Sequence, residues 1–143
     1  MSKLIFVNLP VADLAAARAF YEAIGFTNNP QFTDETAACM VLTETIHVML
    51  LTHEKFAQFT PKAIADAKAT SEVLICISED SREGVDAITG KALAAGGSET
   101  RDPQDYGFMY GRSFEDLDGH IWEPMWMDLA AAQAAMQPEA ATA

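Results

Sequence analysis

The sequence has few basic residues and no long hydrophobic run. Nine Lys and Arg stand against 21 Asp and Glu, which gives a net charge of -12. The basic residues are scattered, so no cluster can follow a phosphate backbone, and nucleic acid is not expected as a partner. No apolar run approaches the roughly 18 residues that a membrane-spanning helix needs. We therefore expect no membrane partner either.

Cysteine is scarce, and its spacing is not that of a disulfide framework or a metal site. Cys39 and Cys76 lie far apart inside apolar runs, without a CxxC pair and without a neighbouring His or Lys. Buried free thiols are the main interpretation and a disulfide is the minor one. The first residues read as a strand rather than a signal peptide, because an acidic residue stands where a cleavage site is expected. These features predict a cytoplasmic protein.

The first half of the chain reads as a strand, a helix and three further strands. A strand is expected over residues 4–9. Asp13 is a suitable N-cap for the helix that follows, and Gly25 ends that helix. Three β-like runs come next, at 26 to about 32, 37–43 and 46–52.

The second half repeats this order after a polar connection, in which Thr60 and Pro61 are typical of a helix start. Asp80 or Ser81 is the expected N-cap of a later helix, which ends at Gly96. The strands expected around that helix cover 72–78, about 98–102, 107–116 and 120–127.

The two halves overlay with few insertions, which indicates an internal repeat of a whole supersecondary unit. The sequence therefore predicts an α+β fold in which two βαβββ modules form mixed, strongly curved sheets around a cavity. At 143 residues, half of them hydrophobic, the chain is long enough for one such domain. The expected parts are a domain at 1–127 with modules of about 1–52 and 71–127, a linker at 53–70, and a C-terminal helix with a disordered tail at 128–143.

Two motifs near the ends of the repeat resemble the vicinal oxygen chelate superfamily, which includes glyoxalase I, extradiol dioxygenases, fosfomycin-resistance enzymes and bleomycin-binding proteins. The resemblance covers about residues 3–127 and is greatest to predicted lactoylglutathione lyase-like proteins. It implies a homodimer, and it implies the fold more strongly than the reaction. The motif residues are Val11, Asp13, Leu14, Phe20, Tyr21, Gly25 and Phe26, then Phe114, Asp116, Asp118, Gly119 and Glu123.

Metal-dependent members of that superfamily place one ligand on the first strand and one on the last strand of each module. Carried over by position, these ligands fall on Phe6, Met49, Val73 and Glu123. Only Glu123 suits a hard or borderline cation, because Phe and Val lack lone pairs and a thioether binds soft metals. The resemblance thus implies a protein without the usual four-ligand metal site, and no cofactor is assigned.

A displaced site for a divalent metal is the alternative. Asn8 shares a strand face with Phe6, and His47 shares one with Met49, so Glu123, His47, Asn8 and water could form such a site. An ordinary strand histidine and a strand-end asparagine are the preferred interpretation.

Glu123 is the candidate catalytic residue. It lies in the apolar run GHIWEPMWM. In a cavity lined by Phe6, Met49, Val73 and Ile121, its carboxylate would be partly desolvated and its pKa raised. It could then act as a general base or accept an N–H or O–H from a ligand. The alternative is that it pairs with an arginine or caps backbone groups at a bulge.

Arg112 is the cation expected to lie closest to Glu123. With Tyr110 on the same strand face, it could bind an anionic ligand or Glu123 itself, and a solvated edge arginine is the alternative. The candidate ligand-binding residues are Phe6, Asn8, His47, Met49, Val73, Tyr110, Arg112 and Ile121.

Three functions stay open at this point. The first is binding of an unknown small molecule, with or without metal-independent catalysis, in a cavity near Glu123. The second is a metal-dependent enzyme of lactoylglutathione lyase or dioxygenase type with a displaced site. The third is an antibiotic-sequestering protein similar to bleomycin-resistance proteins, to which the acidic balance and the aromatic residues Phe108, Trp122 and Trp126 are suited.

Overall fold

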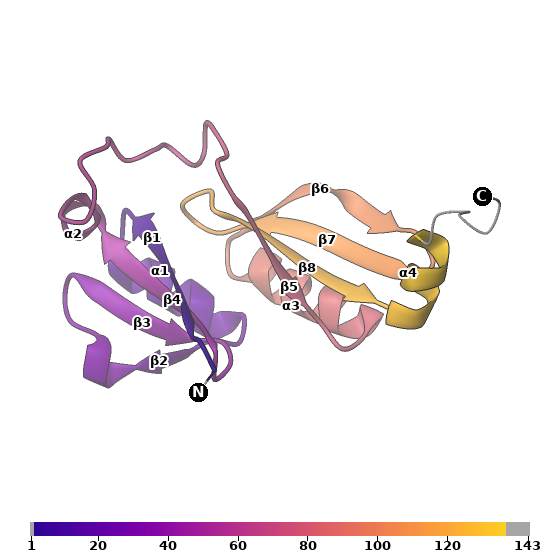
Figure 1. Cartoon of the computed structure of the whole chain (residues 1–143). Helices are drawn as coiled ribbons and strands as arrows, with labels where there is room; N and C mark the ends of the chain where they lie inside the picture. The colour runs from indigo at the N-terminus through magenta and orange to yellow at the C-terminus, as the bar shows by residue number, and fades with distance from the viewer. Residues whose placement is uncertain (1, 137–143) are drawn as a thin grey trace.

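A computed structural model describes residues 2–136 as two modules of the same order (Figure 1). The first module comprises β1 (Ile5–Val11), α1 (Leu14–Ala23), β2 (Thr27–Asn29), the 3₁₀ helix η1 (Pro30–Phe32), β3 (Ala37–Val41) and β4 (Ile46–Thr52). The second comprises β5 (Leu74–Ser78), α3 (Arg82–Ala94), β6 (Ser98–Asp105), β7 (Met109–Glu115) and β8 (Ile121–Met127).

The linker and the C-terminal segment add two short helices. The linker begins with α2 (His53–Ala57) and then crosses from the first module to the second, while α4 (Leu129–Met136) follows β8 (Figure 1). The tail expected beyond Pro138 lies outside the described residues. Within residues 2–136, no helix has both the length and the hydrophobicity that crossing a membrane requires.

The strands form two mixed sheets. Sheet A has the order β1-β4-β3-β2 and sheet B has the order β5-β8-β7-β6. In each sheet the first and last strands of the module are parallel and the other neighbours are antiparallel. The α+β prediction with two βαβββ modules is confirmed, although the sheets are not closed into a barrel.

Local sequence signals explain where both long helices begin and end. The side chain of Asp13 accepts a hydrogen bond from the Ala16 amide at 3.0 Å, and Ser81 caps α3 in the same way through the Gly84 amide. These bonds satisfy amides that have no partner within the helix. Gly25 follows α1 with φ +115°, a conformation that favours glycine.

Three expected elements differ in the structure. The strand expected from 26 to about 32 ends at Asn29, because Pro30 begins η1. No helix starts at Thr60 and Pro61: the linker helix begins at His53, with Thr52 as its N-cap. The first strand continues through Pro10 to Val11, which is tolerated because β1 is an edge strand.

One hydrophobic core joins the two modules. Phe20 and Tyr21 of α1 are buried with Phe114 of β7 and Trp122 of β8. The Tyr21 hydroxyl donates to the Asp116 carboxylate, and the Trp122 indole donates to the Tyr21 oxygen at 2.9 Å. Burial, with Asp116 nearby, raises the pKa of Tyr21 well above its usual value. The modules are thus held together by a buried, hydrogen-bonded aromatic cluster.

The turn before β8 fixes the linker in place. Gly119 has φ +94°, and a Cβ there would lie 2.7 Å from backbone atoms of Ala67 and Lys68. We expect Gly119→Ala to lower the free energy of unfolding by about 2 kcal/mol through backbone strain and displacement of the linker. Urea denaturation measures this loss. Gly90→Ala is the control, since a Cβ at that position meets no atom within 4 Å. Equal stability of the two variants would contradict the close approach.

Candidate functional site

Each sheet has one face on the core and one outer face. In sheet A, Leu9, Val48 and Leu50 point into the core. Because side chains alternate along a strand, the residues between them point outward. The strand register pairs Phe6 with His47 and Asn8 with Met49 on this outer face. The four first-module candidates therefore do lie together, as the sequence predicts.

An aromatic pair marks the outer face of sheet A. The rings of Phe6 and His47 stack with their centroids 4.5 Å apart, and Phe6 is 49% exposed. The Nδ1 atom of His47 is buried and has no hydrogen-bond partner among the described residues. A buried polar atom without a partner costs free energy, so Nδ1 of His47 is an unsatisfied group beside the Phe6 ring.

A polar pair marks the outer face of sheet B. Glu123 on β8 accepts a hydrogen bond from Nη2 of Arg101 on β6, at 3.1 Å. The two side chains are 23% and 32% exposed, respectively. Cys76 lies opposite Glu123 in the strand register, and Ser113 lies opposite Arg101. The alternative in which Glu123 pairs with an arginine is confirmed, although the partner is Arg101 rather than Arg112.

The two cysteines differ in their environment. Cys39 is a buried free thiol, as the sequence predicts, whereas Cys76 is free but exposed on the outer face of sheet B. The prediction of burial is thus wrong for Cys76. Partial burial, and then the negative charge of Glu123, raise the pKa of the Cys76 thiol. A raised pKa keeps the thiol protonated at neutral pH and makes it a weak nucleophile.

Tyr110 and Arg112 lie on the helix side of sheet B, away from Glu123. The Tyr110 hydroxyl donates to Asp86 of α3 at 2.6 Å, and Arg112 contacts Asp86 at 3.0 Å and Glu99 at 2.9 Å. Hydrogen bonds to Glu99 and Asp86 raise the pKa of Arg112. The expectation that Arg112 reaches Glu123 is wrong. In the strand register Arg112 lies opposite Pro124, so both side chains point to the helix side of the sheet. Glu123 is the next residue along β8 and therefore points to the opposite, outer face.

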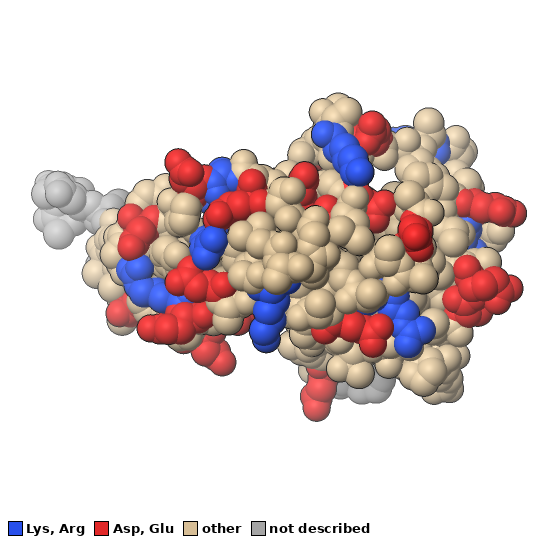
Figure 2. All heavy atoms as spheres, turned by 180° about the vertical axis from the view of Figure 1, so that it is seen from behind, with Lys and Arg blue, Asp and Glu red and all other residues tan. Residues whose placement is uncertain are grey.

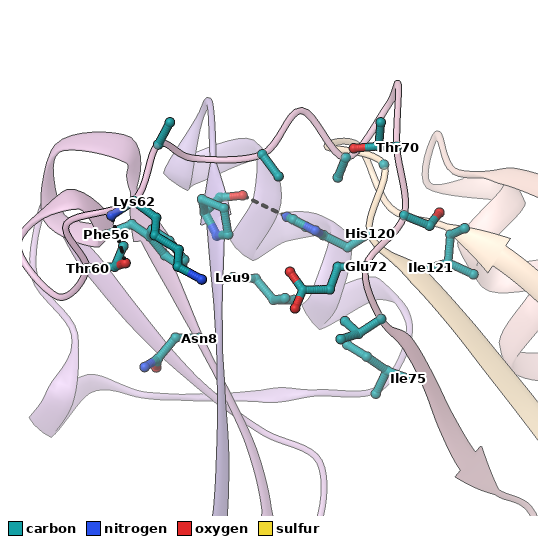
Figure 3. A pocket seen from close by; sticks show the side chains of 17 residues that line it. Asn8, Leu9, Phe56, Thr60, Lys62, Thr70, Glu72, Ile75, His120 and Ile121 are labelled. Atoms are coloured by element: carbon teal, nitrogen blue, oxygen red, sulfur yellow. Dashed lines mark hydrogen bonds between the residues drawn. The ribbon is translucent and has the colours of Figure 1, made fainter.

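The remaining candidates line a pocket under the linker (Figure 3). Asn8, Val73 and Ile121 border it, together with linker residues that include Phe56, Lys62 and Glu72. Its volume is about 300 Å³. Glu123 is not among its lining residues; it lies on the open face of sheet B. This pocket therefore does not have Glu123 at its centre, unlike the cavity that the sequence predicts.

The residues at the superfamily's metal positions do not fit a metal. Phe6 and Val73 offer no lone pair, Met49 offers only a soft thioether, and Glu123 is engaged by Arg101. Within residues 2–136, no three His, Cys, Asp or Glu side chains are grouped so that they could hold a metal ion. Of the displaced set, His47 and Asn8 belong to sheet A and Glu123 to sheet B, where Arg101 already binds its carboxylate.

The two tryptophans expected to suit a cationic compound are engaged within the chain. Trp122 is 1% exposed in the core, and Arg82 lies over the ring of Trp126 at 5.3 Å. Neither indole is therefore free on the outer face. On the molecular face shown in Figure 2, Asp and Glu are spread widely, with Lys and Arg between them.

The first module matches a known protein family. Residues 3–42 match the bleomycin resistance protein-like N-terminal family. No curated protein matches the chain. The matched segment contains β1, α1, β2 and β3, and with them the first of the two motifs in the sequence.

Solved structures share the whole fold. A hypothetical protein from S. aureus is 29% identical, with a TM-score of 0.73 over 88% of this chain and 95% of that chain. A glyoxalase/bleomycin resistance protein/dioxygenase family enzyme from Burkholderia phytofirmans is 21% identical, with a TM-score of 0.71 over 88% and 99% of the two chains. Fosfomycin resistance protein FosX from Mesorhizobium loti is 15% identical, with a TM-score of 0.67 over 92% and 98%. The chain thus has the two-module fold of the glyoxalase/bleomycin resistance/dioxygenase proteins, and together with the family match of its first module this supports the superfamily that the sequence motifs indicate.

Proposed function

We propose that the protein binds a polar small molecule on the outer face of sheet B, with the Arg101–Glu123 pair as the polar centre of the site. One observation carries this proposal: a partly exposed ion pair with an N–O distance of 3.1 Å stands on a sheet face beside the apolar residues Ile121 and Met125. Such a pair offers both a carboxylate acceptor and guanidinium donors, and the apolar neighbours offer contact area.

A second copy of the chain completes the site by covering the outer face. β1 is an edge strand of sheet A and β5 is an edge strand of sheet B, and both carry exposed apolar residues. Phe6 on β1 is 49% exposed and Leu74 on β5 is 55% exposed. An unpaired apolar edge favours association. In a homodimer the outer face of one copy's sheet A can close over the other copy's sheet B, so that His47 and Phe6 meet the ligand bound at Glu123.

Binding that depends on Glu123 is the expected result. Compounds that raise the melting temperature of the wild-type protein are selected first and then titrated by calorimetry. Glu123→Gln and Arg101→Met should each weaken binding about tenfold or more, since the first replaces a charged acceptor by a neutral one and the second removes the charged donors.

The matched control for this experiment is the second ion pair of sheet B. Glu99→Gln and Arg112→Met break the Arg112–Glu99 pair on the helix side of the same sheet. These variants should retain wild-type affinity. Equal affinity for wild type and Glu123→Gln would overturn the proposed site. Turnover of the hemithioacetal of methylglyoxal and glutathione by a metal-loaded protein would instead support the lyase-type alternative.

Sequestration of bleomycin is the second candidate function. The family match of residues 3–42 and the net charge of -12 favour it, because an acidic protein attracts a cationic compound. Calorimetry suits this test better than tryptophan fluorescence, since Trp122 is buried and Trp126 is covered by Arg82. Binding of bleomycin that weakens with added salt would support this candidate, and no heat of binding would exclude it.

A further inference from the structure

The pocket under the linker is a second candidate binding site: Glu123 does not line it, although Ile121, two residues earlier on β8, does. It lies where the linker crosses the edge strands β1 and β5, so both modules and the linker contribute to its wall. A volume of about 300 Å³ is at the lower end of the range for small-molecule sites. Its apolar lining comes from Leu9, Phe56, Val73, Ile75 and Ile121.

Two exposed, oppositely charged residues of the linker face this pocket. The side chains of Lys62 and Glu72 point toward one another across it (Figure 3). Within the part of the chain that the structure describes, neither forms an ion pair with any residue. A cation and an anion that are too far apart to bind each other can each bind one end of a molecule placed between them.

Two polar groups beside these charges are held in position by hydrogen bonds, and a third is not. The Lys62 amide donates to the Thr60 hydroxyl at 3.2 Å. The imidazole of His120 lies 2.7 Å from the Pro10 carbonyl. Because a carbonyl only accepts, Nε2 of His120 carries the hydrogen in this contact. The side-chain amide of Asn8 borders the same space and makes no hydrogen bond to a described residue.

We propose that this pocket binds a free α-amino acid with an apolar side chain. The amino-acid carboxylate binds the Lys62 ammonium, and its ammonium group binds the Glu72 carboxylate. The amino-acid side chain lies against Phe56, Val73 and Ile121. A zwitterion matches this pocket better than a simple anion or cation, since either of those leaves one charged side chain without a partner.

Isothermal titration with L-leucine tests the proposal in the full-length chain. L-leucine should bind, whereas N-acetyl-L-leucine, which lacks the ammonium group, and L-leucinamide, which lacks the carboxylate, should bind about tenfold more weakly. Lys62→Met should weaken L-leucine about tenfold and leave L-leucinamide unchanged. Glu72→Gln should weaken L-leucine and leave N-acetyl-L-leucine unchanged.

Two control variants separate the pocket from general charge effects. Lys68→Met and Glu54→Gln change a linker lysine and a nearby glutamate that do not line the pocket. They should bind L-leucine like wild type, and so should Glu123→Gln, which distinguishes this site from the one on sheet B. Absence of L-leucine binding to wild type, or equal binding by wild type and Lys62→Met, would overturn the proposal.

Discussion

Replacement of Asp116 by alanine is expected to lower the free energy of unfolding by about 3 kcal/mol or more. Asp116 is 4% exposed and accepts hydrogen bonds from the Tyr21 hydroxyl and from the backbone amides of Asp118 and His120. Alanine leaves the buried Tyr21 hydroxyl and the two partly buried amides without this acceptor. Urea denaturation at neutral pH measures the loss. A loss below about 1 kcal/mol would show that the cluster does not hold the modules together.

Asp116→Asn is the matched control, because asparagine keeps the shape and one acceptor oxygen. Burial raises the pKa of Asp116 above its usual 3.8. A raised pKa in the folded state means that the ionised carboxylate costs stability at neutral pH, and this cost disappears as the pH falls through the folded pKa. Wild type should therefore gain stability relative to Asp116→Asn on mild acidification. A difference that does not change with pH would contradict the burial effect.

Phe6→Glu is expected to separate the proposed dimer and to abolish binding at Glu123. A charge placed at the contact between copies has to be desolvated, which costs about 3 kcal/mol or more and raises the dissociation constant about a hundredfold. Sedimentation should give twice the chain mass of 15.5 kDa for wild type and the single-chain mass for the variant.

Phe32→Glu is the control for this variant. Phe32 is 60% exposed in η1, next to β2 at the far edge of sheet A from β1. The control should stay dimeric and bind ligand like wild type. A wild-type protein that sediments as a monomer would refute the proposed dimer. Separation by both variants would show that the loss of the dimer is not specific to β1.

Much of the fold could be predicted because its signals are local. Asp13 and Gly25 delimit α1 through hydrogen bonding and backbone conformation, which depend only on neighbouring residues. The same order of elements in the second half then predicts the second sheet. The linker could not be predicted in this way, because Gly119 and the linker backbone fix it through contacts between residues distant in sequence.

The polar centre of the site could be predicted only in part. Glu123 was identifiable as a carboxylate in an apolar strand. Its partner Arg101 was not identifiable, since the pairing of β6 with β7 shifts between Glu99 and Arg101. Such a bulge turns Arg101 to the outer face while Glu99 stays on the helix side with Arg112. Simple alternation along the strand gives no sign of this shift.

The most direct test of the account mixes two defective chains. His47→Ala impairs the site through sheet A, and Glu123→Gln impairs it through sheet B. If each site combines sheet A of one copy with sheet B of the other, a mixed dimer contains one intact site. Calorimetry of an equal mixture after subunit exchange should then show about one quarter of the sites binding with wild-type affinity, whereas all sites of either variant alone bind about tenfold more weakly or worse. No recovery in mixtures shown to contain mixed dimers would contradict a site shared between two copies.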